Sequence, residues 1–178
     1  LLGFVLSFNV HAQLKYSQLN LLGGTIEIKH EVEGALLEKI SSHSPFYGVA
    51  LSQSFFDANQ REELLQRGIA IGDYVGNQCY YIYIHEEVTK AELTTFGVLG
   101  LQKLPASVKL DPTLNSGFSF PEHVLVDGLL KLNVIVSEYA HQANVHSEFA
   151  KLEVQVVKVS ALASTFRVQV PMYNLSKV

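Results

Sequence analysis

The sequence lacks most of the features that would assign it a chemistry directly. Cys79 is the one cysteine in 178 residues, so it has no partner for an internal disulfide, and we expect it to pack as a small apolar group. The 13 lysine and arginine residues are scattered through a chain of net charge −4, which is not the pattern of a nucleic-acid-binding surface. Hydrophobic residues make up 48% of the chain, which is enough for packed cores and argues against disorder.

Known catalytic motifs are also absent from the sequence. Residues 85–89 begin like the zinc-protease helix motif, but Thr89 stands where the second histidine is required. His141 and His146 are five residues apart and would point in different directions on a helix, as would the adjacent carboxylates Glu62 and Glu63. No nucleophile elbow and no glycine-rich phosphate loop occurs. The sequence therefore predicts no catalytic residue, no metal site and no cofactor.

The stretch from Phe46 to Leu110 has the pattern of one complete α+β unit. Asp57 is a suitable N-cap for a helix that ends before Gly68, where a left-handed residue is favoured. The predicted order is a strand over 46–51, a helix over 57–67, strands over 69–71 and 80–84, a helix over 88–96 and a strand over 101–110. This β-α-β-β-α-β order is that of the ferredoxin-like fold.

The first half of this unit recurs from Lys131 onward. The recurrence pairs seven apolar positions: Val49 with Val134, Leu51 with Val136, Ile69 with Val154, Ile71 with Val156, Tyr80 with Phe166, Ile82 with Val168 and Ile84 with Val170. Keeping each pair on one side of the pleat is what a shared fold requires. We therefore predict the α+β class with tandem ferredoxin-like modules and antiparallel sheets. The second module is expected to be incomplete, because the sequence stops where its second helix should begin.

The N-terminus resembles the end of a signal peptide. The apolar run Leu1–Phe8 is too short to span a bilayer, and no second such run follows. Val10 and Ala12 are small residues suited to signal-peptidase cleavage before Gln13, although the charged start of a signal peptide is missing. Alternatively, residues 1–8 form a buried strand. Cleavage would give a secreted or cell-envelope protein with no membrane anchor.

The expected organisation has five parts: a signal-peptide remnant over 1–12, a loosely attached lead-in over 13–45, a first module over 46–112, a linker rich in turn formers over 113–130 and a second module over 131–178.

The alternation along residues 80–84 predicts a docking face on the sheet. Tyr80, Ile82 and Ile84 would line the core, which leaves Tyr81 and Tyr83 on the face not covered by helices. Their counterparts in the second module are Arg167 and Gln169. In the alternative interpretation the tyrosines only favour strand formation and keep their hydroxyls in water.

Several segments together carry a resemblance to a known family. These are the strand 49–51, the run from Leu64 to Ile71, the corner from Tyr74 to Asn77, the exit segment 104–112 and the ending 168–171. In this order they resemble the N-terminal prodomain of secreted subtilisin-like serine endopeptidases. The resemblance is a pattern of aliphatic residues and turns and covers the larger part of the chain.

The resemblance implies that the chain is a propeptide and has no enzymatic activity of its own. Its partner would be a catalytic domain in cis, whose Asp, His and Ser motifs are not present here. The prodomain would assist folding of that domain, dock on it through the open sheet face and inhibit it, with 110–113 a candidate for a segment in the substrate cleft. Two other classes remain open, an extracellular binding or adhesion module and a small-molecule-binding regulatory domain.

Overall fold

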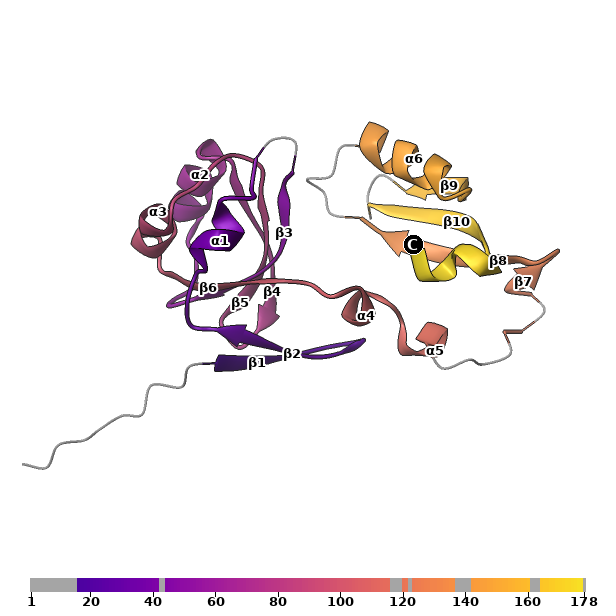
Figure 1. The fold of residues 1–178 in the computed structure, drawn as a ribbon, viewed down its shortest axis with the longest axis horizontal. Coiled ribbons are helices and arrows are strands. Elements are labelled where there is room, and N and C mark those ends of the chain that lie inside the picture. The colour runs from indigo at the N-terminus through magenta and orange to yellow at the C-terminus, as the bar shows by residue number, and fades with distance from the viewer. Residues whose placement is uncertain are drawn as a thin grey trace, which may run out of the picture. The chain divides into compact units, whose positions relative to one another are not determined.

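The structure is a mixed α+β arrangement of antiparallel sheets and helices (Figure 1). It is a computed structural model, which describes residues 16–41, 44–115, 120–121, 123–136, 142–160 and 164–177. The chain divides into two compact units, Leu1–Asn115 and Ser116–Val178.

The main sheet of the first unit has four strands in the order β4-β5-β3-β6, and all neighbours are antiparallel. Its elements are β3 (Phe46–Ser52), α2 (Ala58–Gln66), β4 (Ile69–Gly76), β5 (Cys79–Ile84), α3 (Lys90–Thr95) and β6 (Val98–Lys103). The last strand therefore begins and ends earlier than the predicted 101–110. Pro105 explains the earlier end, because it has no N–H for a ladder and instead precedes the short helix α4 (Ala106–Lys109).

Local signals in the sequence account for the helices α2 and α3 of this unit. Asp57 and Gln60 form a reciprocal capping box at the start of α2, as do Thr89 and Glu92 at the start of α3. Gly68 ends α2 with a φ of 75°, a left-handed conformation that glycine adopts without strain. The prediction of Asp57 as the N-cap is confirmed.

Helices α2 and α3 cover one face of this sheet (Figure 1). Leu64 and Leu93 from the two helices are fully buried there. Tyr80, Ile82 and Ile84 of β5 belong to the same core, as their alternation predicted.

A hairpin that precedes this sheet covers its other face. Strands β1 (Tyr16–Leu21) and β2 (Gly24–Lys29) pair around a turn at Leu22 and Gly23, and the short helix α1 (Gly34–Leu37) follows. The hairpin residues Leu19, Ile26 and Ile28 form a second core with sheet residues that include Val49, Leu51 and Cys79. The expectation of a loosely attached lead-in is therefore wrong, because its aliphatic residues complete the first unit.

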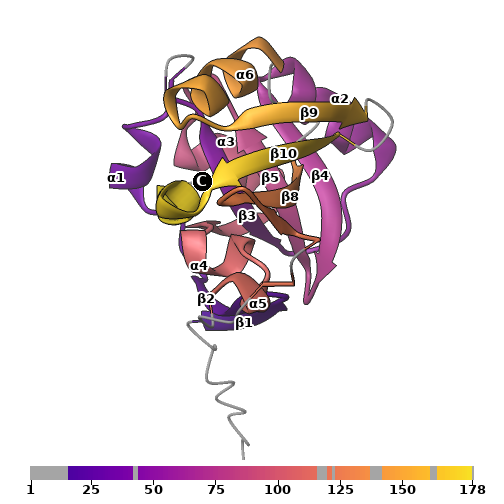
Figure 2. The same cartoon turned by 90° about the vertical axis from the view of Figure 1, so that its right-hand side faces the viewer.

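The second unit has four strands in the order β7-β8-β10-β9, again antiparallel. Its elements are β7 (Leu125–Val126), β8 (Leu129–Ile135), α6 (Gln142–Lys151), β9 (Gln155–Ser160), β10 (Thr165–Pro171) and the 3₁₀ helix η2 (Met172–Lys177). The short helix α5 (Pro112–Asn115) precedes these elements and forms the end of the first unit. Helix α6 lies against β9 and β10 in both views (Figure 2), and Phe149 from this helix packs edge-on against Phe166 with ring centroids 5.5 Å apart.

The two sheets correspond, but not in the register that the apolar pairs predicted. Tyr80 lies opposite Ala50 in the first unit, whereas its counterpart Phe166 lies opposite Val134. Val134 therefore corresponds to Ala50 and not to Val49, so the predicted pairing of the first strands is wrong by one residue. The physical reason is that β3 is apolar on both faces, so hydrophobicity alone does not fix its register.

Candidate partner-docking faces

The predicted docking residues of the first unit lie on a face that is largely closed. Tyr81 packs against the hairpin core, and its ring stacks on Tyr47 with centroids 6.2 Å apart. Tyr83 is half-buried and stacks on His85 at 5.5 Å. Neither tyrosine stands on a bare sheet surface.

Two close contacts hold the hairpin on the sheet. A side chain at Gly100 of β6 would meet the Lys29 carbonyl oxygen at less than van der Waals distance, so glycine permits the two backbones to touch. In addition, the Asn77 side chain donates a hydrogen bond of 2.9 Å to the Gln18 carbonyl oxygen. Asn77 and Gln78 both have positive φ, as the two central residues of a type I′ turn do.

Burial raises the pKa values of two titratable side chains on this face. Burial raises the pKa of Tyr47, with smaller contributions from the neighbouring Tyr81 and Asp73. Burial also raises the pKa of the Cys79 thiol to about 11. Cys79 is fully buried and donates to the Asn77 carbonyl oxygen at 3.4 Å, which confirms that it packs as a small apolar group.

The second sheet has α6 on one face, and its other face differs in composition from the hairpin-covered face of the first sheet. Lys131, Lys158 and Arg167 are exposed on it. Cross-strand pairing places Arg167 between Asn133 and Lys158, and places Gln169 between Lys131 and Gln155. Arg167 Nε donates to Asn133 Oδ1 at 3.5 Å. The predicted residues Arg167 and Gln169 therefore lie together on a polar, cationic face.

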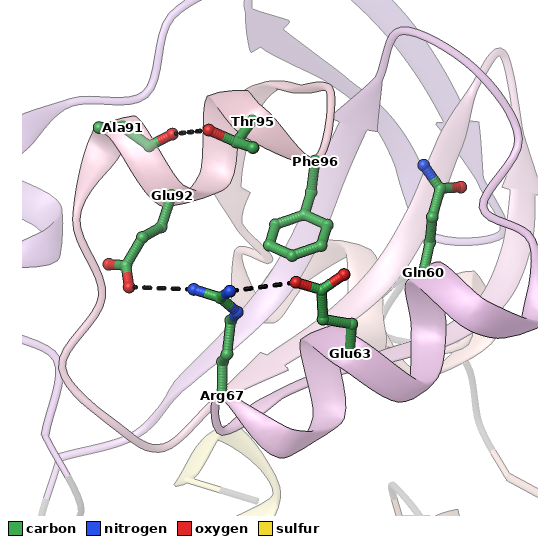
Figure 3. A pocket seen from close by; sticks show the side chains of 7 residues that line it. All are labelled: Gln60, Glu63, Arg67, Ala91, Glu92, Thr95 and Phe96. Carbon is green, nitrogen blue, oxygen red and sulfur yellow. Dashed lines mark hydrogen bonds and ion pairs between the residues drawn. The ribbon is translucent and has the colours of Figure 1, made fainter.

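A groove of about 390 Å³ between α2 and α3 is centred on Arg67 (Figure 3). The Arg67 guanidinium pairs with Glu63 at 3.0 Å and with Glu92 at 3.6 Å, and it lies 5.3 Å from the centre of the Phe96 ring. These contacts join the two helices and neutralise the only cation in the groove. The arrangement is accounted for as helix-to-helix packing.

Nothing in the described ranges forms a metal site or a membrane span. Those ranges hold no group of three or more His, Cys, Asp or Glu side chains placed to bind a metal, and none of their helices has the length and hydrophobicity to cross a bilayer. Thr89, which interrupts the zinc-protease motif, caps α3. His146 packs on the Phe166 ring at 5.5 Å, while His141 and the cleavage residues Ala12 and Gln13 lie outside the described residues.

The candidate for an inhibitory segment, residues 110–113, runs into a short helix. Residues Pro112–Asn115 form α5, and Asp111 Oδ1 accepts bonds from the Thr113 N–H and hydroxyl at 2.9 and 2.6 Å. These bonds lower the pKa of Asp111 and stabilise a helix start. A short helix cannot add to a sheet edge as a strand.

Sequence reasoning missed the closure of the first face. The signal was present in the alternating Leu19 and Leu21, and Ile26 and Ile28, on either side of Gly23 and Gly24, which is a hairpin pattern.

No protein-family model matches the chain, and no curated protein or solved structure matches it at a significant level.

Proposed function

We propose that this chain is the pro-region of a secreted subtilisin-like serine endopeptidase and that it consists of two ferredoxin-like modules. In this role it assists folding of a catalytic domain in cis and inhibits that domain until it is cleaved away. The chain itself performs no catalysis.

The observation that carries the proposal is the arrangement of the first sheet. Its chain order is β-α-β-β-α-β and its strand order is β4-β5-β3-β6, and both support a ferredoxin-like module, in which the first and third strands are central. In the second unit β9, β10 and β8 repeat the order of β4, β5 and β3. There β7 occupies the place beside β8 that β6 occupies beside β3.

The corner from Tyr74 to Asn77, which resembles that of the family, supports the proposal further, because both of its polar side chains make hydrogen bonds within the first unit. Asn77 ties the β4–β5 turn to the hairpin, and the Tyr74 hydroxyl accepts from the Gln78 N–H at 3.4 Å. Such preformed turns favour a module that is rigid before it meets its partner, and a rigid module gives up less conformational entropy on docking.

The test is a titration of the chain into the separately expressed catalytic domain of its precursor, with peptidase activity as the readout. We expect saturable inhibition, and recovery of activity from denatured catalytic domain only when the chain is present. If neither occurs, or if the precursor encodes no peptidase, the proposal is rejected in favour of an extracellular binding module.

The same assay tests the tyrosines that the sequence singled out. The variant carrying Tyr81→Ser and Tyr83→Ser should be compared with wild type after circular dichroism has shown an intact fold. An inhibition constant equal to that of wild type would remove Tyr81 and Tyr83 from the docking surface.

A further inference from the structure

We propose that the second unit, and not the first, makes the partner contact, and that its cationic sheet face binds a carboxylate-rich surface of the catalytic domain. This inference rests on the proposed function. It adds which unit docks and the charge of the surface on which it docks.

The first step is the concentration of charge on one face. Strands β7 to β10 contain three cations, Lys131, Lys158 and Arg167, and no carboxylate. All three lie on the face that points away from the core. Lys131 and Arg167 alternate with core residues along their strands, and Lys158 pairs with Arg167 and therefore shares its face. The chain as a whole carries a net charge of −4, so a basic composition does not explain this face.

The second step is that the charges are placed at a cost to the isolated unit. Arg167 and Lys158 lie directly opposite each other on adjacent antiparallel strands. Like charges in this position destabilise a sheet. No ion pair in the described part of the chain involves either residue or Lys131. Carboxylates supplied by a partner would remove the repulsion.

The third step compares the two units in the corrected register. The positions in the first unit that correspond to Lys131, Asn133 and Arg167 are Tyr47, Val49 and Tyr81. That face is apolar and is covered by its own hairpin. Within the described residues no element covers the second face, where Ile135 is 81% exposed. The first unit has thus already used the face that the second unit still offers.

The chemistry of the face favours an acidic protein over a nucleic acid. Neighbouring strands are about 5 Å apart, so Lys158 and Arg167 can reach carboxylates within one small patch. Sheet faces that bind single-stranded nucleic acid carry aromatic side chains on which bases stack. The strand residues on this face include no aromatic side chain.

The experiment compares two variants that carry the same change of charge. The face variant carries Lys131→Gln, Lys158→Gln and Arg167→Gln. The control carries Lys39→Gln, Lys103→Gln and Lys109→Gln, which are exposed lysines of the first unit that take part in no ion pair there. Both variants are made in the full 178-residue chain, and circular dichroism and urea denaturation verify that they fold.

In the inhibition assay the face variant should raise the inhibition constant about tenfold, as the loss of three exposed charge pairs implies, and the control less than about twofold. The effect should diminish at high salt. A version of the face variant that carries Arg167→Lys in place of Arg167→Gln should recover part of the affinity. Equal inhibition constants for the two variants would overturn the inference while leaving the proposed function intact.

A second arm uses fluorescein-labelled poly-L-glutamate as the probe and does not depend on a peptidase. Wild type and control should bind it in fluorescence anisotropy, and the face variant should not. If wild type fails to inhibit but this difference is seen, the proposed function fails and the carboxylate-binding face stands. If the face variant binds as wild type does, or if polyuridylate binds wild type more tightly than polyglutamate at equal salt, the inference is overturned.

Discussion

Replacing Gly100 by alanine tests whether the hairpin is an integral cover of the first sheet. The new Cβ would lie far inside van der Waals distance of the Lys29 carbonyl oxygen, and 3.5 Å from Ile28 Cγ2. The first of these atoms is backbone, so no side-chain rotation can relieve the contact and β2 must move away from β6.

The cost can be bounded from both sides. Overpacking a tight interior contact costs about 1–3 kcal/mol. Complete release of the hairpin would expose Leu19, Ile26 and Ile28 at about 1.5–3 kcal/mol each, which is more than the clash itself costs. The hairpin should therefore stay docked but shifted, and the free energy of unfolding should fall by about 1–3 kcal/mol.

The assay is urea denaturation followed by tyrosine fluorescence, with hydrogen exchange of the β1 and β2 amides as the local readout. Gly34→Ala is the matched control, because a Cβ there has no atom within 4 Å and the position is helical. It should leave stability unchanged or raise it slightly. If Gly100→Ala costs no more than Gly34→Ala, and hairpin amides exchange at the wild-type rate, the close approach of β2 to β6 is refuted.

Three further predictions concern single side chains. Thr89→Ala should lower the free energy of unfolding by about 0.5–2 kcal/mol, because it removes the N-cap of α3, whereas Thr95→Ala, which loses a bond to the Ala91 carbonyl within the helix, should cost less in the same urea titration. Hydrogen bonds from the Thr89 side chain and backbone, and the charge of Arg67, lower the pKa of Glu92. The ionised Glu92 side chain therefore stabilises the fold above its ordinary pKa of 4.5, and this stabilisation is lost as the pH falls through the folded-state pKa. The difference in free energy of unfolding between wild type and Glu92→Gln should narrow on acidification, and a difference that widens would contradict this. The Cys79 thiol should react with a thiol reagent at the rate at which the first unit opens, since its pKa of about 11 leaves it protonated at neutral pH and its side chain is buried; rapid labelling of the native protein would show that the site is accessible.

The elements that could be predicted from the sequence are those with strong local signals. Asp57 and Gly68 marked the two ends of α2 within a residue, because a cap and a left-handed terminator act on neighbouring backbone groups only. The alternation of Tyr80, Ile82 and Ile84 likewise identified the core face of β5, since one inward residue fixes the rest of a strand.

What could not be predicted depends on contacts between distant segments. The hairpin pattern at Leu19 to Ile28 is visible in the sequence, but the face on which a hairpin packs is set by tertiary contacts such as Asn77 with Gln18. The register of β3 was ambiguous for a related reason. A strand that is buried on both faces has no polar residue to indicate which side faces solvent, so the alignment with β8 slipped by one position.

The slip bears on function because it changes which residues share a face. In the predicted register Val49 matched Val134, and the first-strand residues of both units would have faced their helices. In the observed register Val49 matches Asn133, and Tyr47 matches Lys131, so the same backbone position is apolar where a hairpin covers it and polar where none does. Residue composition on that face thus follows the cover of each sheet. A partner that docks on the second unit must accordingly offer charge to this face, whereas one that docks on the first would have to displace Leu19, Ile26 and Ile28 from their core.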